Sequence, residues 1–416
     1  MSIVYDIAKK AKEASYFLSG IKTGMKNQVL KKISVALIEK SHEIIDANKK
    51  DCEIARGSIS DSLLDRLTLN TERIKSISDS ITEVITLNDP VGEVIFGYDL
   101  PNGLTLKNIR VPFGVIGIIF EARPNVTVDS AVLCLKAGSA VILRGSSNAL
   151  NTNLKIVGIM RGCLKEMDFP EDLVQLIPTA SREDVQELFS LRQYIDVLIP
   201  RGGKGLIESV VQNSKIPVIE TGIGNCHIYI DSRFSLKEKQ VIDIVVNAKT
   251  QRPSVCNAAE KLLIHRSVFE TTGRAVIDAL KQKKVIIKGC PSVVKMYSDV
   301  EPASEEDWYE EYLDLKMAVK VVESTKEAVE HINKYGSMHS DSIITSDYEN
   351  AMYFTSNVDS STVYVNASTR FTDGGQFGMG AEIGISTQKL HFRGPMGLRQ
   401  ITTNKFIIYG DGQIRE

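Results

Sequence analysis

The chain has 416 residues, of which 43% are hydrophobic, 25% charged and 6% aromatic, values that are ordinary for a globular protein. They exclude a disordered chain, a fibrous repeat and a small disulfide-stapled scaffold, and at about 150 residues per domain the length predicts two or three domains. The chain has 50 basic and 52 acidic residues and a net charge of −2, so a general nucleic-acid binder, which is usually much more basic, is not expected.

The cysteines and the N-terminus both indicate a reducing compartment. The six cysteines, at positions 52, 134, 163, 226, 256 and 290, include no CxxC pair, which favours free thiols over a disulfide framework. The first twenty residues contain Asp6, Lys9 and Glu13 and lack the apolar core of a secretory signal. The longest strongly apolar stretch, 111–120, is much shorter than the about 20 residues of a membrane span. We therefore expect a cytoplasmic protein without a membrane partner.

Helical spacing dominates the first ninety residues, and strands follow. Apolar residues three to four apart predict helices over 8–18, 27–48 and 62–87. After Asp89-Pro90, which ends the helical region, the pattern predicts strands over 92–97, 104–111 and 114–120. The turn Pro101-Asn102-Gly103 makes the first two strands a hairpin.

From residue 130 to about 366, predicted helices and strands alternate, which indicates βαβ units and mostly parallel sheets. The helices are expected over 130–136, 151–165, 181–190, 205–213, 241–250, 268–281, 325–333 and 348–355. The strands are expected over 139–144, 173–178, 195–200, 217–220, 227–231, 261–265, 285–287, 319–322, 342–345 and 363–365, and a glycine-rich tail ends in a strand over 405–409. The pattern predicts an α/β protein with two lobes and a hairpin that pairs with the tail.

No standard phosphate-binding or metal-binding motif is present in the sequence. The nearest matches to GxGxxG, at Gly203-Lys204-Gly205 and Gly222-Ile223-Gly224, lack the third glycine, and GxxxxGK[ST] and HExxH do not occur. In the strand predicted there, the adjacent side chains of Cys226-His227 would point to opposite faces, so they form a poor chelate. We expect no metal site.

Cys256 is the best candidate nucleophile. It follows a predicted helix and a polar turn, and it precedes a short helical stretch expected over 257–260. A helix N-terminus and the guanidinium of Arg252 would both favour a thiolate, the form that attacks an acyl carbon. The alternative is a buried structural cysteine, the role expected for Cys134. A thiol hydrolase is a second alternative, although no histidine lies near Cys256 in the sequence.

Two further polar clusters follow predicted strands, where ligands of parallel sheets bind. After the strand that ends at residue 120, Asn125 offers an amide donor for an oxyanion and Arg123 a cation for an anionic group. For Arg123 a surface ion pair is the alternative. After the strand that ends at residue 144, Arg144 and Ser146 offer the charge and the hydroxyl that suit a dinucleotide with a 2′-phosphate.

Eight stretches of the chain together resemble the aldehyde dehydrogenase superfamily and, within it, the γ-glutamyl phosphate reductase family. They are VPFGVIG (111–117), EARPNV (121–126), NAKTQRPSVCN (247–257), HSDSIIT (339–345), NASTRF (366–371), GAEIGIST (380–387), HFRGPMGL (391–398) and GDGQ (410–413). The resemblance covers nearly the whole chain. It also accounts for the missing GxGxxG, because this superfamily holds its dinucleotide without that motif.

The fold that the resemblance implies is aldehyde dehydrogenase-like, with two Rossmann-like parallel-sheet lobes and a small β oligomerisation arm. The cofactor-binding domain would span 1–225, interrupted by a hairpin at 93–111. The catalytic domain, with the nucleophilic cysteine, would span 226–394. The hairpin at 93–111 and the tail at 395–416 would form the arm.

The resemblance also implies roles for individual residues. Cys256 matches the family's nucleophile, and Asn125 matches the asparagine that stabilises the oxyanion. The residues that match the cofactor site are Arg144, Gly145, Ser146 and Glu311. Leu313 stands where many relatives carry an aromatic residue, which weakens the match at Glu311. Glu220 occupies the position of the general base in hydrolytic members, and it receives no catalytic role because an acyl-phosphate reductase needs no activated water.

The activity implied is the NADPH-dependent reduction of L-glutamyl 5-phosphate to L-glutamate 5-semialdehyde and phosphate, through a cysteine thioester, in L-proline biosynthesis. Arg123, Arg252 and Arg370 are the candidates for binding the substrate's phosphate and carboxylate. The resemblance further implies a homo-oligomer and association with glutamate 5-kinase. Another aldehyde or acyl-phosphate dehydrogenase of the same superfamily is the alternative, and the residues separate neither NADP from NAD nor a dimer from a tetramer.

Overall fold

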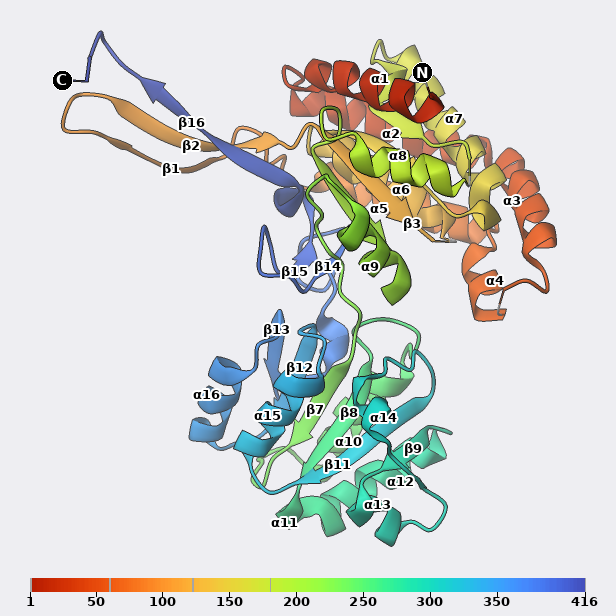
Figure 1. Cartoon of the computed structure of the whole chain (residues 1–416), viewed down its shortest axis with the longest axis vertical. Coiled ribbons are helices and arrows are strands. Elements are labelled where there is room, and N and C mark those ends of the chain that lie inside the picture. Colours follow the sequence, from red (N-terminus) through yellow and green to blue (C-terminus); the bar gives the residue numbers. More distant parts are fainter. Residues whose placement is uncertain (1, 60, 122, 180, 416) are drawn as a thin grey trace. The chain divides into compact units, whose positions relative to one another are not determined.

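The chain passes between two structural units four times along its length (Figure 1). In this computed structural model, which describes residues 2–59, 61–121, 123–179 and 181–415, unit 1 comprises 1–221, 378–384 and 396–416. Unit 2 comprises 222–377 and 385–395. Within the described residues, no helix combines the length and the apolarity that crossing a membrane requires.

Helices open unit 1, as the apolar spacing predicts. They are α1 (Ile3–Leu18), α2 (Thr23–Glu39), α3 (Ser41–Ala55), α4 (Asp61–Leu67) and α5 (Thr71–Thr86). The single helix expected over 27–48 is wrong, because the backbone leaves helical geometry at Lys40, with φ −98° and ψ 20°. The helix expected over 62–87 is also divided. Asn70 caps a new helix there, because its Oδ1 accepts the Arg73 N–H at 2.8 Å.

A four-stranded parallel sheet, in the order β5-β4-β3-β6, forms the centre of unit 1. Its strands are β3 (Val115–Phe120), β4 (Ala140–Arg144), β5 (Val174–Leu176) and β6 (Val197–Arg201). The helices that alternate with them are α6 (Pro124–Lys136), α7 (Leu150–Glu166), α8 (Arg182–Ser190) and α9 (Lys204–Asn213), with short 3₁₀ turns η1 (Ser147–Ala149) and η2 (Glu171–Leu173). Every residue of β3 is buried, as a strand covered on both faces must be.

Two expectations for unit 1 are corrected by the structure. The helix predicted over 130–136 begins at Pro124, because proline suits the first position of a helix, so Asn125 lies in a helical turn rather than in a loop. The strand predicted over 217–220 makes only an isolated bridge between Val218 and Leu198. Pro217 has no N–H to contribute to a longer ladder.

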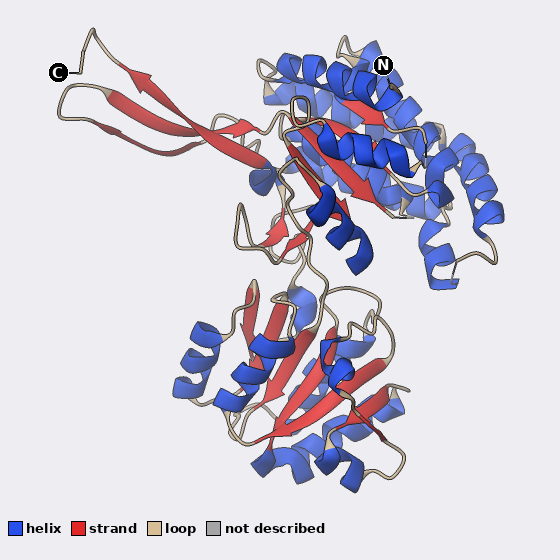
Figure 2. Ribbon diagram, viewed as in Figure 1, coloured by secondary structure: helices blue, strands red, loops and turns tan. Residues whose placement is uncertain are grey.

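The predicted pairing of hairpin and tail is confirmed. Strands β1 (Val94–Asp99), β2 (Thr105–Pro112) and β16 (Thr402–Tyr409) form an antiparallel sheet with β2 in the middle. The tail strand pairs along its full length, from Thr402 opposite Pro112 to Tyr409 opposite Thr105. Figure 2 shows these strands as a long ribbon extending from the helices of unit 1.

Unit 2 is built on a seven-stranded parallel sheet in the order β10-β9-β11-β8-β7-β12-β13. The strands are β7 (Cys226–Ile230), β8 (Ala259–His265), β9 (Ile286–Gly289), β10 (Glu301–Pro302), β11 (Lys316–Val322), β12 (Ser340–Ile344) and β13 (Thr362–Val365). The helices are α10 (Glu238–Thr250), α11 (Arg266–Val268), α12 (Arg274–Gln282), α13 (Pro291–Met296), α14 (Glu305–Tyr309), α15 (Thr325–Tyr335) and α16 (Tyr348–Asn357), with a π turn η3 (Phe269–Gly273) and a 3₁₀ turn η4 (Thr369–Phe371). The C-terminal region adds the ladder of β14 (Gly384–Ser386) with β15 (Gly394–Met396) and the 3₁₀ turn η5 (Leu398–Ile401).

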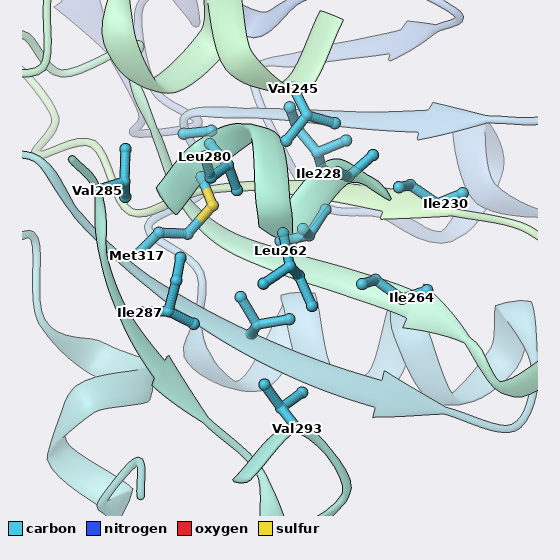
Figure 3. Packing of buried hydrophobic residues seen from close by; sticks show 14 of the residues in the cluster. Ile228, Ile230, Val245, Leu262, Ile264, Leu280, Val285, Ile287, Val293 and Met317 are labelled. Carbon is cyan, nitrogen blue, oxygen red and sulfur yellow. The ribbon is translucent and has the colours of Figure 1, made fainter. Parts of the chain in front are cut away.

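Both faces of the unit 2 sheet are covered. On one face, Ile228 and Leu262 pack with Val245 of α10 and Leu280 of α12 in a large apolar core (Figure 3). On the other face, Tyr229 of β7 and its neighbours pack against α15 and α16. Alternate residues of one strand therefore face two cores.

Candidate active site

Cys256 lies in the turn between α10 and β8, and its half-buried side chain is not part of a disulfide. The helical stretch expected over 257–260 is wrong. The Ala258 N–H bonds to the Val255 carbonyl at 3.0 Å in a turn, and the chain enters β8 at Ala259. The described residues that follow Cys256 form a turn and a strand, so no helix dipole from this segment favours a thiolate, and nearby cations are the remaining influence.

The backbone on both sides of Cys256 is held tightly. The Cys226 thiol donates to the Cys256 carbonyl oxygen, with Sγ and O 3.1 Å apart. At the next residue, Asn257 Nδ2 donates to the Thr372 carbonyl oxygen at 2.8 Å. Gly224 packs so closely that a Cβ there would lie 2.5 Å from Cys256 Cα and nearer still to its carbonyl group. The position of the Cys256 backbone is therefore set by its neighbours in unit 2.

Two arginines, Arg252 and Arg370, lie near Cys256. Burial lowers the pKa of Arg370. Negative charge at Cys256 raises this pKa, and the positive charge of Arg252 lowers it further. Arg370 Nε donates to Gln251 Oε1 at 2.8 Å, which orients the guanidinium. The structure thus brings Cys256, Arg252 and Arg370 into one region.

Glu311 also lies near the Cys256 loop, through Gly224. Its Oε1 accepts the Gly224 N–H at 2.6 Å, and burial raises its pKa. Behind it lies a buried ion pair that sequence reasoning missed, in which Lys249 Nζ and Glu260 Oε2 are 2.9 Å apart. The sequence signal is a charged residue next to an apolar one at each end of this connection, Lys249 near the end of α10 and Glu260 near the start of β8.

Asn125, in unit 1, is an exposed residue in the first turn of α6. Its Nδ2 donates to Asp129 Oδ2 one turn later, at 3.1 Å. Asp129 Oδ1 in turn accepts from the Ser80 hydroxyl at 3.3 Å, and burial raises the pKa of Asp129. The amide orientation is therefore held by a carboxylate. Arg123 is exposed at the N-cap of the same helix, and the neighbouring Ala122 of the EARPNV motif lies outside the described residues.

The predicted cofactor residues of unit 1 lie where β4 ends. Arg144 is the last residue of that strand, and burial lowers its pKa. Gly145 packs directly against Asn153, leaving no space for a Cβ. The Ser146 hydroxyl is buried and, within the part of the chain that the structure describes, has no hydrogen-bond partner. A buried donor without a partner fits a polar ligand at this edge of the sheet, as a dinucleotide requires.

A glycine-rich turn at the end of β6 adds to the same edge. Gly203 is the N-cap of α9, and its N–H donates to Glu121 Oε1 at 3.2 Å. At Gly202 a Cβ would lie 2.7 Å from Glu121 Cδ. Glycines that open a helix after a parallel strand suit phosphate groups. Gly203-Lys204-Gly205 lacks the third glycine of GxGxxG, and its position at the start of α9, directly after β6, makes it a candidate for phosphate contact.

Comparison with known proteins identifies the family of this chain. A profile of the aldehyde dehydrogenase family matches residues 3–292. The chain belongs to the aldehyde dehydrogenase family. It is 57% identical to the gamma-glutamyl phosphate reductase of Clostridium perfringens over 98% of both chains, and 52% identical to that of Caldicellulosiruptor bescii over 100% of both.

Solved structures of aldehyde dehydrogenase family members confirm the predicted fold. The crystal structure of gamma-glutamyl phosphate reductase from Thermotoga maritima matches with a TM-score of 0.97 and 48% identity, covering 100% of both chains. An acetylating aldehyde dehydrogenase from Geobacillus thermoglucosidasius shares the fold at 16% identity, with a TM-score of 0.72. The chain is thus an enzyme of the aldehyde dehydrogenase family, whose members use NAD or NADP.

Proposed function

We propose that this enzyme reduces L-glutamyl 5-phosphate to L-glutamate 5-semialdehyde and phosphate, with NADPH, in L-proline biosynthesis. The observation that carries the proposal is the 57% identity to a gamma-glutamyl phosphate reductase over 98% of both chains. The grouping of the Cys256 thiol with two arginines in unit 2 supports it, because the substrate presents an acyl carbon, a phosphate and a carboxylate.

In the proposed reaction the Cys256 thiolate attacks the γ-acyl carbon. The S–C bond forms, and the bond between the acyl carbon and the bridging oxygen of the phosphate breaks. Phosphate leaves with the electron pair of that bond. Arg252 and Arg370 are the proposed ligands of that phosphate, and Asn125 Nδ2 is the proposed donor to the oxyanion. Bound NADPH supplies the hydride that reduces the acyl carbon. Cleavage of the C–S bond then releases the aldehyde and returns the thiolate, and the proton consumed overall is taken up by phosphate.

Arg144, Gly145 and Ser146 at the end of β4, with Glu311 in unit 2, are the proposed cofactor residues. The choice of NADPH over NADH rests on Arg144, a cation that suits a 2′-phosphate. Arg123 is a proposed contact for the substrate carboxylate. No catalytic role is proposed for Glu220.

Assembly and location belong to the same proposal. The sheet of β1, β2 and β16 exposes large apolar side chains on a long ribbon, among them Phe96, Tyr98, Phe406 and Ile408. An exposed apolar edge of this kind favours pairing with a second copy of the chain. We propose a cytoplasmic homo-oligomer that forms through this arm, 93–111 with 395–416, and associates with glutamate 5-kinase.

The decisive experiment is phosphate-dependent oxidation of glutamate 5-semialdehyde with NADP and with NAD. The wild-type enzyme should reduce NADP only when phosphate is present, and Cys256→Ala should abolish turnover. Cys163→Ser, in α7 of unit 1, is the control and should keep it. Retained turnover in Cys256→Ala, or turnover independent of phosphate, would refute the proposal. Faster turnover of another aldehyde would favour a different acyl-phosphate dehydrogenase.

A further inference from the structure

A buried ion pair lies beneath the turn that carries Glu311. The side chains of Lys249 and Glu260 are completely buried, and their charged atoms are 2.9 Å apart. Removing two charges from water is costly, and apolar residues of the same volume often give an equally stable protein. The other groups to which the pair is hydrogen-bonded are therefore a better guide to its role than its contribution to stability.

The Glu260 carboxylate has two further partners in the turn of residues 310–313, called here the Glu311 turn. Oε2 accepts the N–H of Tyr312 and Oε1 accepts the N–H of Leu313, each at 3.3 Å. Leu313 has a φ of 54°, in the left-handed region that leucine rarely adopts. An unusual conformation persists only where the surroundings enforce it, and here a buried carboxylate bonds to the strained residue directly.

A second lysine, Lys261 of β8, holds the other side of the Glu311 turn. Lys261 Nζ donates to the Glu310 carbonyl oxygen at 2.7 Å, and it lies 4.5 Å from the centre of the Tyr312 ring. Both ends of the turn are thus tied to consecutive residues of β8, Glu260 and Lys261. That strand begins three residues after Cys256.

The Glu311 turn connects to the nucleophile's loop through one residue. Glu311 Oε1 accepts the Gly224 N–H at 2.6 Å, and Gly224 packs against the backbone of Cys256 without room for a side chain. A displacement of the turn would therefore reach both the Glu311 carboxylate and the nucleophile.

We infer that Lys249 and Glu260 are positioning residues, whose ion pair fixes the Glu311 turn and thereby the Glu311 carboxylate and the Cys256 loop. The inference rests on the proposed function for the role of Glu311 toward the cofactor. The placement of Cys256 is independent of the proposed function. The pair touches neither substrate nor cofactor, and it acts by holding groups that do.

The test compares this ion pair with a similar one elsewhere. Glu260→Gln removes the negative charge while keeping the size of the side chain and one of its oxygens. Lys249→Met removes the positive charge. Lys26→Met is the matched control, because Lys26 forms a buried pair with Asp89 in unit 1, also at 2.9 Å. All three variants are expected to lose thermal stability, so melting temperature alone does not distinguish the roles.

Two of the readouts need no substrate. Trp308, the single tryptophan of the sequence, is buried three residues before Glu311, so quenching of its fluorescence by acrylamide reports on the turn. The rate at which iodoacetamide alkylates Cys256, measured against pH, reports on the nucleophile. The third readout is the split between the KM for NADP and kcat in the semialdehyde assay.

We expect Glu260→Gln and Lys249→Met to raise acrylamide quenching of Trp308 and to shift the pH profile of Cys256 alkylation. They should also raise the KM for NADP by about tenfold, because small displacements at an active site have large effects. Lys26→Met should leave all three readouts at wild-type values. If Glu260→Gln does not fold, Glu260→Asp, which keeps the charge, should show the same changes to a smaller degree.

Folded Glu260 variants with wild-type quenching, alkylation and KM would overturn the inference. So would equal changes in Lys26→Met. A chain that failed to oxidise glutamate semialdehyde would refute the proposed function and leave the quenching and alkylation results to decide this inference independently.

Discussion

Replacing Gly224 with alanine should disable the enzyme, although Gly224 has no side chain to take part in the chemistry. An ideal Cβ at this position would lie 2.5 Å from Cys256 Cα and closer to the Cys256 carbonyl carbon and oxygen. Ordinary contacts between such atoms are about 3.5 to 4.0 Å, so the Cys256 loop must move by at least about 1 Å. A misplacement of about 1 Å can lower the rate about 100-fold, and overpacking costs about 1 to 3 kcal/mol of stability.

The assay for Gly224→Ala is kcat for phosphate-dependent NADP reduction, together with the alkylation rate of Cys256. Gly162→Ala in α7 is the control, because nothing lies within 4 Å of its Cβ position. In a helix this substitution should keep full activity and add up to about 1 kcal/mol of stability. A wild-type kcat in Gly224→Ala would refute the reasoning, because it would mean that the loop can move without consequence for the nucleophile.

Three further predictions concern pH and polar contacts. Burial lowers the pKa of His339 to about 4 and of His331 to about 2, from 6.5, so the unfolded state binds more protons as the pH falls below 6.5. The urea midpoint should therefore drop between pH 7.5 and about pH 5, by less in His339→Gln, and an equal drop in that variant would contradict this assignment. Arg370→Lys should raise the KM for phosphate about tenfold in the semialdehyde assay, because lysine lacks the fork of donors that grips a phosphate; an unchanged KM would exclude Arg370 from the phosphate site. Asp129→Ala should lower kcat about tenfold with little change in the KM for phosphate, because the Asn125 amide loses the acceptor that orients it; a wild-type kcat would remove Asp129 from the mechanism.

Most of the fold could be predicted because its signals are local. Apolar stripes and fully apolar runs of the kind seen in β3 give the type and order of most elements. The errors lie where one residue decides the outcome. Lys40 ends a helix without a glycine or a proline to mark it, and Pro217 interrupts a run that otherwise suits a strand. The turn at Cys256 looks helical in composition, but the requirement that β8 begin at Ala259 overrides that preference.

In the candidate site, too, contacts between residues close in the sequence could be predicted, and contacts between distant residues could not. The proximity of Arg252 to Cys256 could be predicted, because the two residues are four apart in the sequence, whereas Arg370 comes near them only through the fold. The ion pair of Lys249 with Glu260 joins residues eleven apart, and its bonds to the Glu311 turn span more than fifty residues, a distance that no local pattern covers. The tight packing of Gly224 on Cys256 is likewise a tertiary fact. Sequence shows that a glycine is present, and only the fold shows what it excludes.

The position of β2 between β1 and β16 has a consequence for synthesis on the ribosome. Strand β1 precedes β2 by a few residues, but β16 starts at Thr402, almost three hundred residues after β2 ends at Pro112. One edge of β2 therefore stays open while the whole of unit 2, through residue 395, is translated and free to fold. During that interval the nascent chain exposes a strand with one open edge, the condition in which strands join the wrong partner. The pairing of β16 with β2 is therefore among the latest backbone contacts that unit 1 can form during synthesis.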